Sequence, residues 1–94
     1  MIVGLLTLHL HLPAIESLKA KRSIVKGILA KVNRRGPAFA VAEVADLDDL
    51  NRATIRVAYL SNDSHRANSV LSRLRSALET GKGYVVEDYD LEIL

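Results

Sequence analysis

Apolar residues recur along this chain with two different periods, and the order of those periods limits the fold. Alternation of apolar and polar residues predicts half-buried strands, while apolar residues three or four positions apart predict amphipathic helices. In 94 residues the segments follow one another as strand, helix, strand, strand, helix, strand. A chain of this length buries one modest core, so we expect residues 1–94 to form a single α+β domain.

The first predicted strand covers residues 2–12 and ends at Pro13. Its inward face carries Leu6, Leu8, Leu10 and Leu12, and its other face carries Val3, Leu5, Thr7, His9 and His11. The first predicted helix begins near Ser17, a suitable N-cap, and ends before Gly36-Pro37. Gly27 within it costs up to ~1 kcal/mol relative to alanine, so we expect close packing there.

The remaining elements follow from the same patterns. Residues 38–45 predict a second strand, residues 46–51 a turn-rich connection, and residues 52–61 a third strand. A second helix follows the capping groups of Ser61-Asn62-Asp63, with Ala67, Val70, Leu71, Leu74, Ala77 and Leu78 at helical spacing. After Gly81 and Gly83, the alternation over residues 88–93 predicts the last strand.

Two right-handed strand-helix-strand units make a four-stranded antiparallel sheet with both helices on one face, the ferredoxin-like βαββαβ arrangement. We expect the first and third strands to lie parallel in its centre, with the starts of both helices at one edge. Arg34 and Arg35 should then reach the other edge, beside the acidic connection of residues 46–49.

Composition excludes several classes of protein. Cysteine is absent, which removes disulfides, thiolate metal sites and cysteine nucleophiles, and suits a reducing cytoplasm. No apolar run approaches the ~18 residues that a membrane span needs, and the first residues lack the basic region of a secretory signal. We therefore expect a cytoplasmic protein with no membrane partner.

The net charge is only +2, but the two signs are unevenly distributed. The last eight residues hold Glu87, Asp88, Asp90 and Glu92. Between Ser17 and Arg35 there is no acidic residue, and the cations are Lys19, Lys21, Arg22, Lys26, Lys31, Arg34 and Arg35. This stretch of the chain is the strongest candidate for contact with an anionic partner.

Several segments resemble the YlxP-like bacterial domains of unknown function. They are Ser17-Leu18-Lys19-Ala20-Lys21-Arg22-Ser23, Val41-Ala42-Glu43-Val44, Asp48, Asn51-Arg52-Ala53-Thr54, Val57-Ala58, Ser61-Asn62-Asp63 and Glu92-Ile93-Leu94. The resemblance implies a ferredoxin-like fold, a cytoplasmic location and genes beside those for translation initiation and ribosome-maturation factors. It implies no established activity. Leu50 and Asn51 stand where the family commonly has tryptophan and glutamine, so a stacking role for that loop is not carried over.

The start of the first helix is a candidate phosphate site. Lys19, Lys21 and Arg22 surround free amide donors and the positive end of the helix dipole, and Lys26 follows one turn later. Lys21 falls inside the apolar stripe, so either its ammonium emerges from the core edge or the helix begins after it. We expect these four residues to contact RNA backbone, with ribosomal RNA or a ribosomal particle as partner; the alternative is a solvated helix face.

The sheet face without helices is a second candidate surface. It should carry Val3, Leu5 and Leu60 around Arg56, an apolar patch with charged rims. If Arg56 faced Asp90 or Glu92 of a second copy, the surface would form an isologous homodimer. The alternatives are a protein or small-ligand module, or an open solvated face.

His9 and His11 could bind a metal together with Asp88 or Asp90 from the last strand. Exposed histidines beside acids are more commonly cross-strand pairs, and no third fixed ligand is evident. We therefore expect no metal and no cofactor.

The sequence carries no pattern for catalysis. Ser17, Ser61 and Ser64 lack an evident base, and no glycine-rich phosphate loop follows a strand. Acylphosphatases use an arginine in a glycine-rich loop after the first strand, where this chain has Pro13-Ala14-Ile15-Glu16. Stacking of RNA bases would need aromatic residues on the open sheet face, but Tyr59 is predicted to face the core. We expect a non-enzymatic protein.

Overall fold

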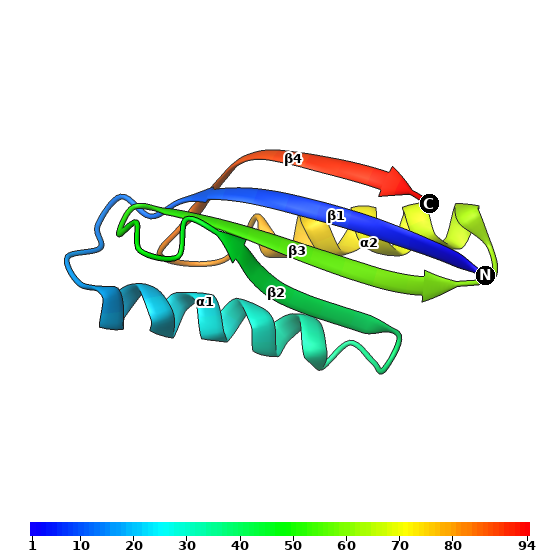
Figure 1. The fold of residues 1–94 in the computed structure, drawn as a ribbon, viewed down its shortest axis with the longest axis horizontal. Coiled ribbons are helices and arrows are strands. Elements are labelled where there is room, and N and C mark those ends of the chain that lie inside the picture. The colour runs from blue at the N-terminus through cyan, green and yellow to red at the C-terminus, as the bar shows by residue number, and fades with distance from the viewer.

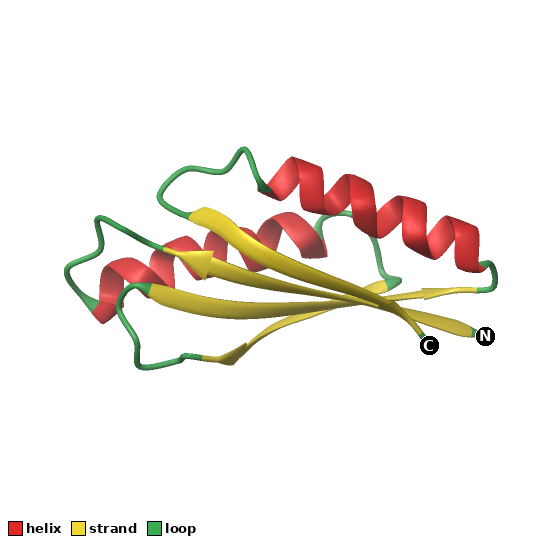
Figure 2. Cartoon of the chain, turned by 90° about the horizontal axis from the view of Figure 1, so that it is seen from above, coloured by secondary structure: helices red, strands yellow, loops and turns green.

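A computed structural model describes residues 1–94 and contains the six predicted elements in the predicted order. They are β1 (Ile2–His11), α1 (Leu18–Asn33), β2 (Phe39–Ala45), β3 (Arg52–Ser61), α2 (Ser64–Leu78) and β4 (Val85–Ile93), shown in Figure 1. The strands form one sheet, and both helices lie on the same side of it (Figure 2). The predicted α+β, ferredoxin-like fold is confirmed. Neither helix is long and apolar enough to cross a membrane.

The strand order is β2-β3-β1-β4, and every neighbouring pair is antiparallel. The prediction that the first and third strands are parallel was therefore wrong. The crossover through α1 leaves β1 and β2 pointing the same way, and the turn after β2 reverses the chain, so β3 runs against β1. The two helices consequently begin at opposite ends of the sheet (Figure 1). The turn between β2 and β3 lies near the start of α1, at the far end from Arg34 and Arg35.

The core lies between the sheet and the two helices. The even-numbered leucines of the first strand segment are all buried, with Leu6, Leu8 and Leu12 at 0% exposure, as the alternation predicted. They pack with residues from both helices and from β3, including Val25, Ile28, Val32, Ile55, Val57, Leu71, Leu74 and Leu78. Removing apolar surface from water stabilises a fold by about 25 cal/mol for each Å². This cluster holds most of the buried apolar side chains, so it is the main source of that stabilisation.

The predicted helix caps are present. Ser17 Oγ accepts a hydrogen bond from the Ala20 amide at 3.1 Å, and Asp63 Oδ1 accepts one from the His65 amide at 2.9 Å. These bonds satisfy amide groups that have no partner inside the helix, and so they fix where each helix begins.

The last strand begins three residues before the alternation indicates, at Val85 rather than residue 88. Its pairing with β1 shifts between His9, which is opposite Asp88, and Leu10, which is opposite Val86. Glu87 is the extra residue of this β-bulge, and it reverses which residues face the helices. The period-two pattern therefore breaks at Glu87 although the strand continues.

Candidate nucleic-acid interface

Lys21 is buried, with only 2% of its surface exposed, and it lies on the core face of α1. Its ammonium donates hydrogen bonds to the carbonyl oxygens of Asp46 and Leu47, and lies 3.1 Å from Glu43 Oε2. Both expectations for this residue were wrong, because α1 begins upstream at Leu18 and the ammonium does not emerge. The antiparallel sheet brings the turn after β2 against this end of α1. Lys21 is therefore unavailable to a phosphate.

The backbone of Asp46 is held in the left-handed region, with φ of 62°. Aspartate is one of the few residues other than glycine that adopts this conformation readily. Its carbonyl accepts the bond from Lys21, and its Oδ2 accepts a hydrogen bond of 2.9 Å from Thr54 Oγ1. Lys21 thus fixes the turn between β2 and β3 rather than a ligand.

Glu43 is the ion-pair partner of Lys21, and the sequence analysis did not identify it. Phe39, Val41 and Glu43 alternate with exposed residues along β2 and are all partly buried. A charged residue is unusual on a face that packs against the core, and this holds both for the acid on β2 and for the lysine on α1. Because a buried charge requires a partner, the two anomalies together could have predicted the pair.

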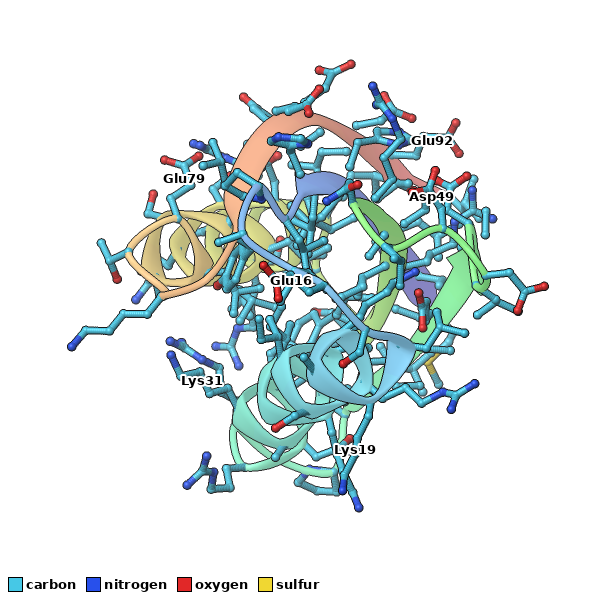
Figure 3. All side chains as sticks on the ribbon, turned by 90° about the vertical axis from the view of Figure 1, so that its left-hand side faces the viewer. Glu16, Lys19, Lys31, Asp49, Glu79 and Glu92 are labelled. Carbon is cyan, nitrogen blue, oxygen red and sulfur yellow. The ribbon has the colours of Figure 1, made fainter.

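The other predicted cations of this site are exposed. Lys19, Arg22 and Lys26 lie on the solvent side of α1 and form no ion pair within the chain. The first turn of α1 contains no acidic residue, so nothing in the helix neutralises this end. Figure 3 shows that Lys19 points away from the sheet, whereas Lys31 lies on the side of α1 nearest α2. The helix thus presents positive charge on two flanks.

The predicted acidic neighbours of Arg34 and Arg35 are absent. Neither residue forms an ion pair, and Arg34 Nε donates instead to the Ala30 carbonyl at 3.3 Å. The acidic connection after β2 lies at the other end of α1, next to Lys21. Both arginines therefore add to the unpaired positive charge of this helix.

Val3, Leu5, Arg56 and Leu60 all lie on the sheet face without helices, as predicted. Leu5 is opposite Ala58 on β3 and Glu92 on β4. In the next row, Thr7 is opposite Arg56 and Asp90. Arg56 Nε donates a hydrogen bond of 3.1 Å to Thr7 Oγ1, and Arg56 forms no ion pair within the chain. A hollow of about 80 Å³ opens beside it, lined by Leu5, Thr7, Arg56, Asp90 and Glu92.

The two histidines of β1 each have one acidic neighbour. His9 is directly opposite Asp88, one of the two acids that the sequence offered as its neighbour, and His11 Nδ1 lies 3.5 Å from Glu87 Oε1. No group of three side chains of metal-binding type occurs in the structure. His9 and Asp88 thus lie across from each other on neighbouring strands, while the acid near His11 is Glu87 rather than Asp88 or Asp90.

The aromatic side chains near the sheet lie on the helix side. Tyr59 packs against the core as predicted, with its ring 4.8 Å from that of Phe39. Tyr89 lies beneath the guanidinium of Arg75 from α2, at 4.3 Å. The open face therefore offers no aromatic platform on which RNA bases could stack.

A family model described as a protein of unknown function, DUF503, matches residues 3–91. The chain belongs to the DUF503 family. No curated protein matches it.

In this DUF503 domain, most of the segments that resemble YlxP-like domains meet at one end of the fold. Ser17 caps α1, and Lys21 binds Glu43 and the turn after β2. Asn51 Nδ2 donates a hydrogen bond of 2.9 Å to the Leu12 carbonyl, and Thr54 holds Asp46. These residues hold the structure together. Among the matching cations, Lys21 and Arg52 form ion pairs within the chain, whereas Lys19 and Arg22 form none.

Proposed function

We propose that this DUF503 domain is a non-enzymatic cytoplasmic protein that binds the backbone of structured RNA through Lys19, Arg22 and Lys26 of α1. The observation that carries the proposal is the acid-free solvent face of this helix, whose cations form no ion pair within the chain. Cations that neutralise phosphates release counterions from the RNA, which supplies most of the affinity of sequence-independent binding.

The position of Lys19 and Arg22 supports a binding role. Cations at a helix start oppose the helix dipole, so their placement lowers the stability of the domain slightly. A helix that served only solubility could carry these charges at its other end, where they stabilise. The same dipole and the free amides of the first turn favour an anion at this position.

The resemblance to YlxP-like domains supports ribosomal RNA or a ribosomal particle as the partner. The open sheet face has no aromatic side chain for stacking, which favours contact with phosphates over recognition of bases. Binding of this kind depends on the shape and charge of the RNA rather than on its sequence.

A salt series with a fluorescently labelled ribosomal RNA hairpin tests the proposal by anisotropy. The variant Lys19→Gln, Arg22→Gln, Lys26→Gln should bind more weakly, with a shallower dependence of log affinity on log salt, by about 0.7 to 0.9 for each lost phosphate contact. The matched control is Arg52→Gln, Arg66→Gln, Arg73→Gln, which removes the same charge elsewhere and should bind nearly as the wild type. Equal weakening by both triple variants, or no binding by the wild type, would refute the site. Lys21 stays unchanged because it is part of the core.

A homodimer, or another protein or ligand contact, through the open sheet face is a second candidate. It is favoured by the unpaired Arg56 beside the unpaired Asp90 and Glu92, since two copies related by a two-fold axis could pair them. Leu60 is also 47% exposed on this face. Sedimentation velocity should show a dimer that Val3→Asp with Leu60→Asp converts to monomers. A wild-type monomer would refute the homodimer, and a dimer that persists in the variant would refute this interface.

A further inference from the structure

A groove of about 520 Å³ runs between α1 and the connection from α2 to β4. It lies on the side of α1 where Figure 3 shows Lys31, which is one of its lining residues. Its polar lining combines three cations with two hydroxyl groups and contains no acid: Lys31, Arg34, Lys82, Ser23 and Thr80. A hollow with this lining is suited to phosphate oxygens.

The three cations of the groove have no acidic partner within the protein. Lys31, Arg34 and Lys82 are exposed and form no ion pair. Glu79, the acidic residue that precedes Thr80 in the chain, is paired with Arg75 on α2. An incoming anion therefore meets three cations and no competing internal carboxylate.

The far wall of the groove is fixed before any ligand arrives. Tyr84 is 8% exposed, and its hydroxyl donates a hydrogen bond to the Leu78 carbonyl at the end of α2. Gly83, at φ of +90°, lies so close to α1 that a Cβ atom there would be 2.8 Å from Ile24 Cδ1. The connection is thus held against α1, and a ligand would not have to order it.

Gly27, at the middle of α1, is one of the lining residues, and the space that its side chain would occupy is open. A Cβ atom at this position would meet no heavy atom within 4 Å, so the expectation that close packing requires this glycine was wrong. Glycine inside a helix is unfavourable compared with alanine, and packing within the chain gives no reason for it. An absent side chain leaves the helix backbone open to close approach from outside.

We propose that this groove binds phosphate groups of the same RNA, as a second contact that continues from Lys19, Arg22 and Lys26 across the outer surface of α1. This inference rests on the proposed function and extends it to Lys31, Arg34 and Lys82. The backbone of one RNA strand then crosses α1 beside Gly27 and ends against the wall formed by residues 80–84.

Two variants of the groove test this inference with the labelled RNA hairpin and salt series. Lys31→Gln, Arg34→Gln, Lys82→Gln should lower affinity by about tenfold or more and reduce the salt slope by at least about 0.7. Gly27→Leu keeps every charge and fills the groove with a side chain that favours helix. It should raise or preserve thermal stability and still weaken RNA binding severalfold.

The outcomes separate the groove from the proposed function. If the Lys19, Arg22, Lys26 variant loses binding while both groove variants bind as the wild type, the groove is refuted and the proposed function stands. If the groove charge variant weakens binding but Gly27→Leu does not, the cations act only at a distance and occupancy of the groove is refuted. If the wild-type protein does not bind RNA, both proposals fail.

Discussion

Lys21 Nζ lies 3.1 Å from Glu43 Oε2, and the two side chains are only 2% and 14% exposed. One residue belongs to α1 and the other to β2, so the pair joins the helix to the edge of the sheet. The bonds from Lys21 to the Asp46 and Leu47 carbonyls extend this link to the following turn. A residue from the most basic segment of the chain is thus part of the interior, beneath the surface that we propose for RNA.

We expect Lys21→Met to destabilise the domain by about 3 kcal/mol, because it leaves the Glu43 carboxylate without its charge partner. Urea unfolding followed by circular dichroism measures this free energy. The double variant Lys21→Met, Glu43→Leu should recover much of the loss, since no buried charge remains. A single variant as stable as the wild type would show that the ion pair is not formed.

Gly27→Ala should raise the free energy of unfolding by about 0.5 to 1 kcal/mol, because the methyl group meets no atom and alanine favours helix. Gly83→Ala is the matched control. It should destabilise the domain, since its φ is +90° and its Cβ would collide with Ile24. Thermal melting of both variants gives the comparison, and a destabilising Gly27→Ala would mean that the helix packs differently.

Burial raises the pKa of the Tyr84 phenol above its ordinary value of 10.0, because desolvation disfavours the charged form. The contribution of this residue to stability is therefore complete below pH 10 and is lost as the pH rises through its raised pKa in the folded state. Tyr84→Phe should cost about 1 kcal/mol at neutral pH, because it removes the bond to the Leu78 carbonyl. In urea unfolding at increasing pH, the gap between wild type and variant should narrow above pH 10; a constant gap would contradict the assignment.

Asp46→Ala should cost about 1 to 2 kcal/mol, because it strains a left-handed residue and leaves the Thr54 hydroxyl without its acceptor. Asp46→Asn is the matched control, since asparagine adopts the same backbone conformation and keeps an oxygen acceptor. Its stability should lie close to that of the wild type. Equal destabilisation by both substitutions would indicate that the carboxylate charge matters more than the turn geometry.

The sequence predicted the type and order of every helix and strand. Local physics explains this success, because side-chain alternation in β1 and the cap at Ser17 depend on residues close in the chain. The sequence also placed Val3, Leu5, Arg56 and Leu60 on one face of the sheet. Side chains alternate between the two faces along each strand, so this assignment needs no knowledge of the partner strand. The bulge at Glu87 interrupts the alternation of faces within β4, and for this reason the predicted start of that strand was wrong.

Only the tertiary structure decided which distant residues meet. The sequence by itself determined that Lys21 lies on the apolar face of α1, but its role depended on the direction of β3 and the position of the following turn. The groove beside Gly27 likewise exists because the connection after α2 packs against Ile24, a contact between residues far apart in the chain. Periodicity assigns each residue to a face of its own element, whereas pairing of charges and formation of grooves depend on how those faces are brought together in space.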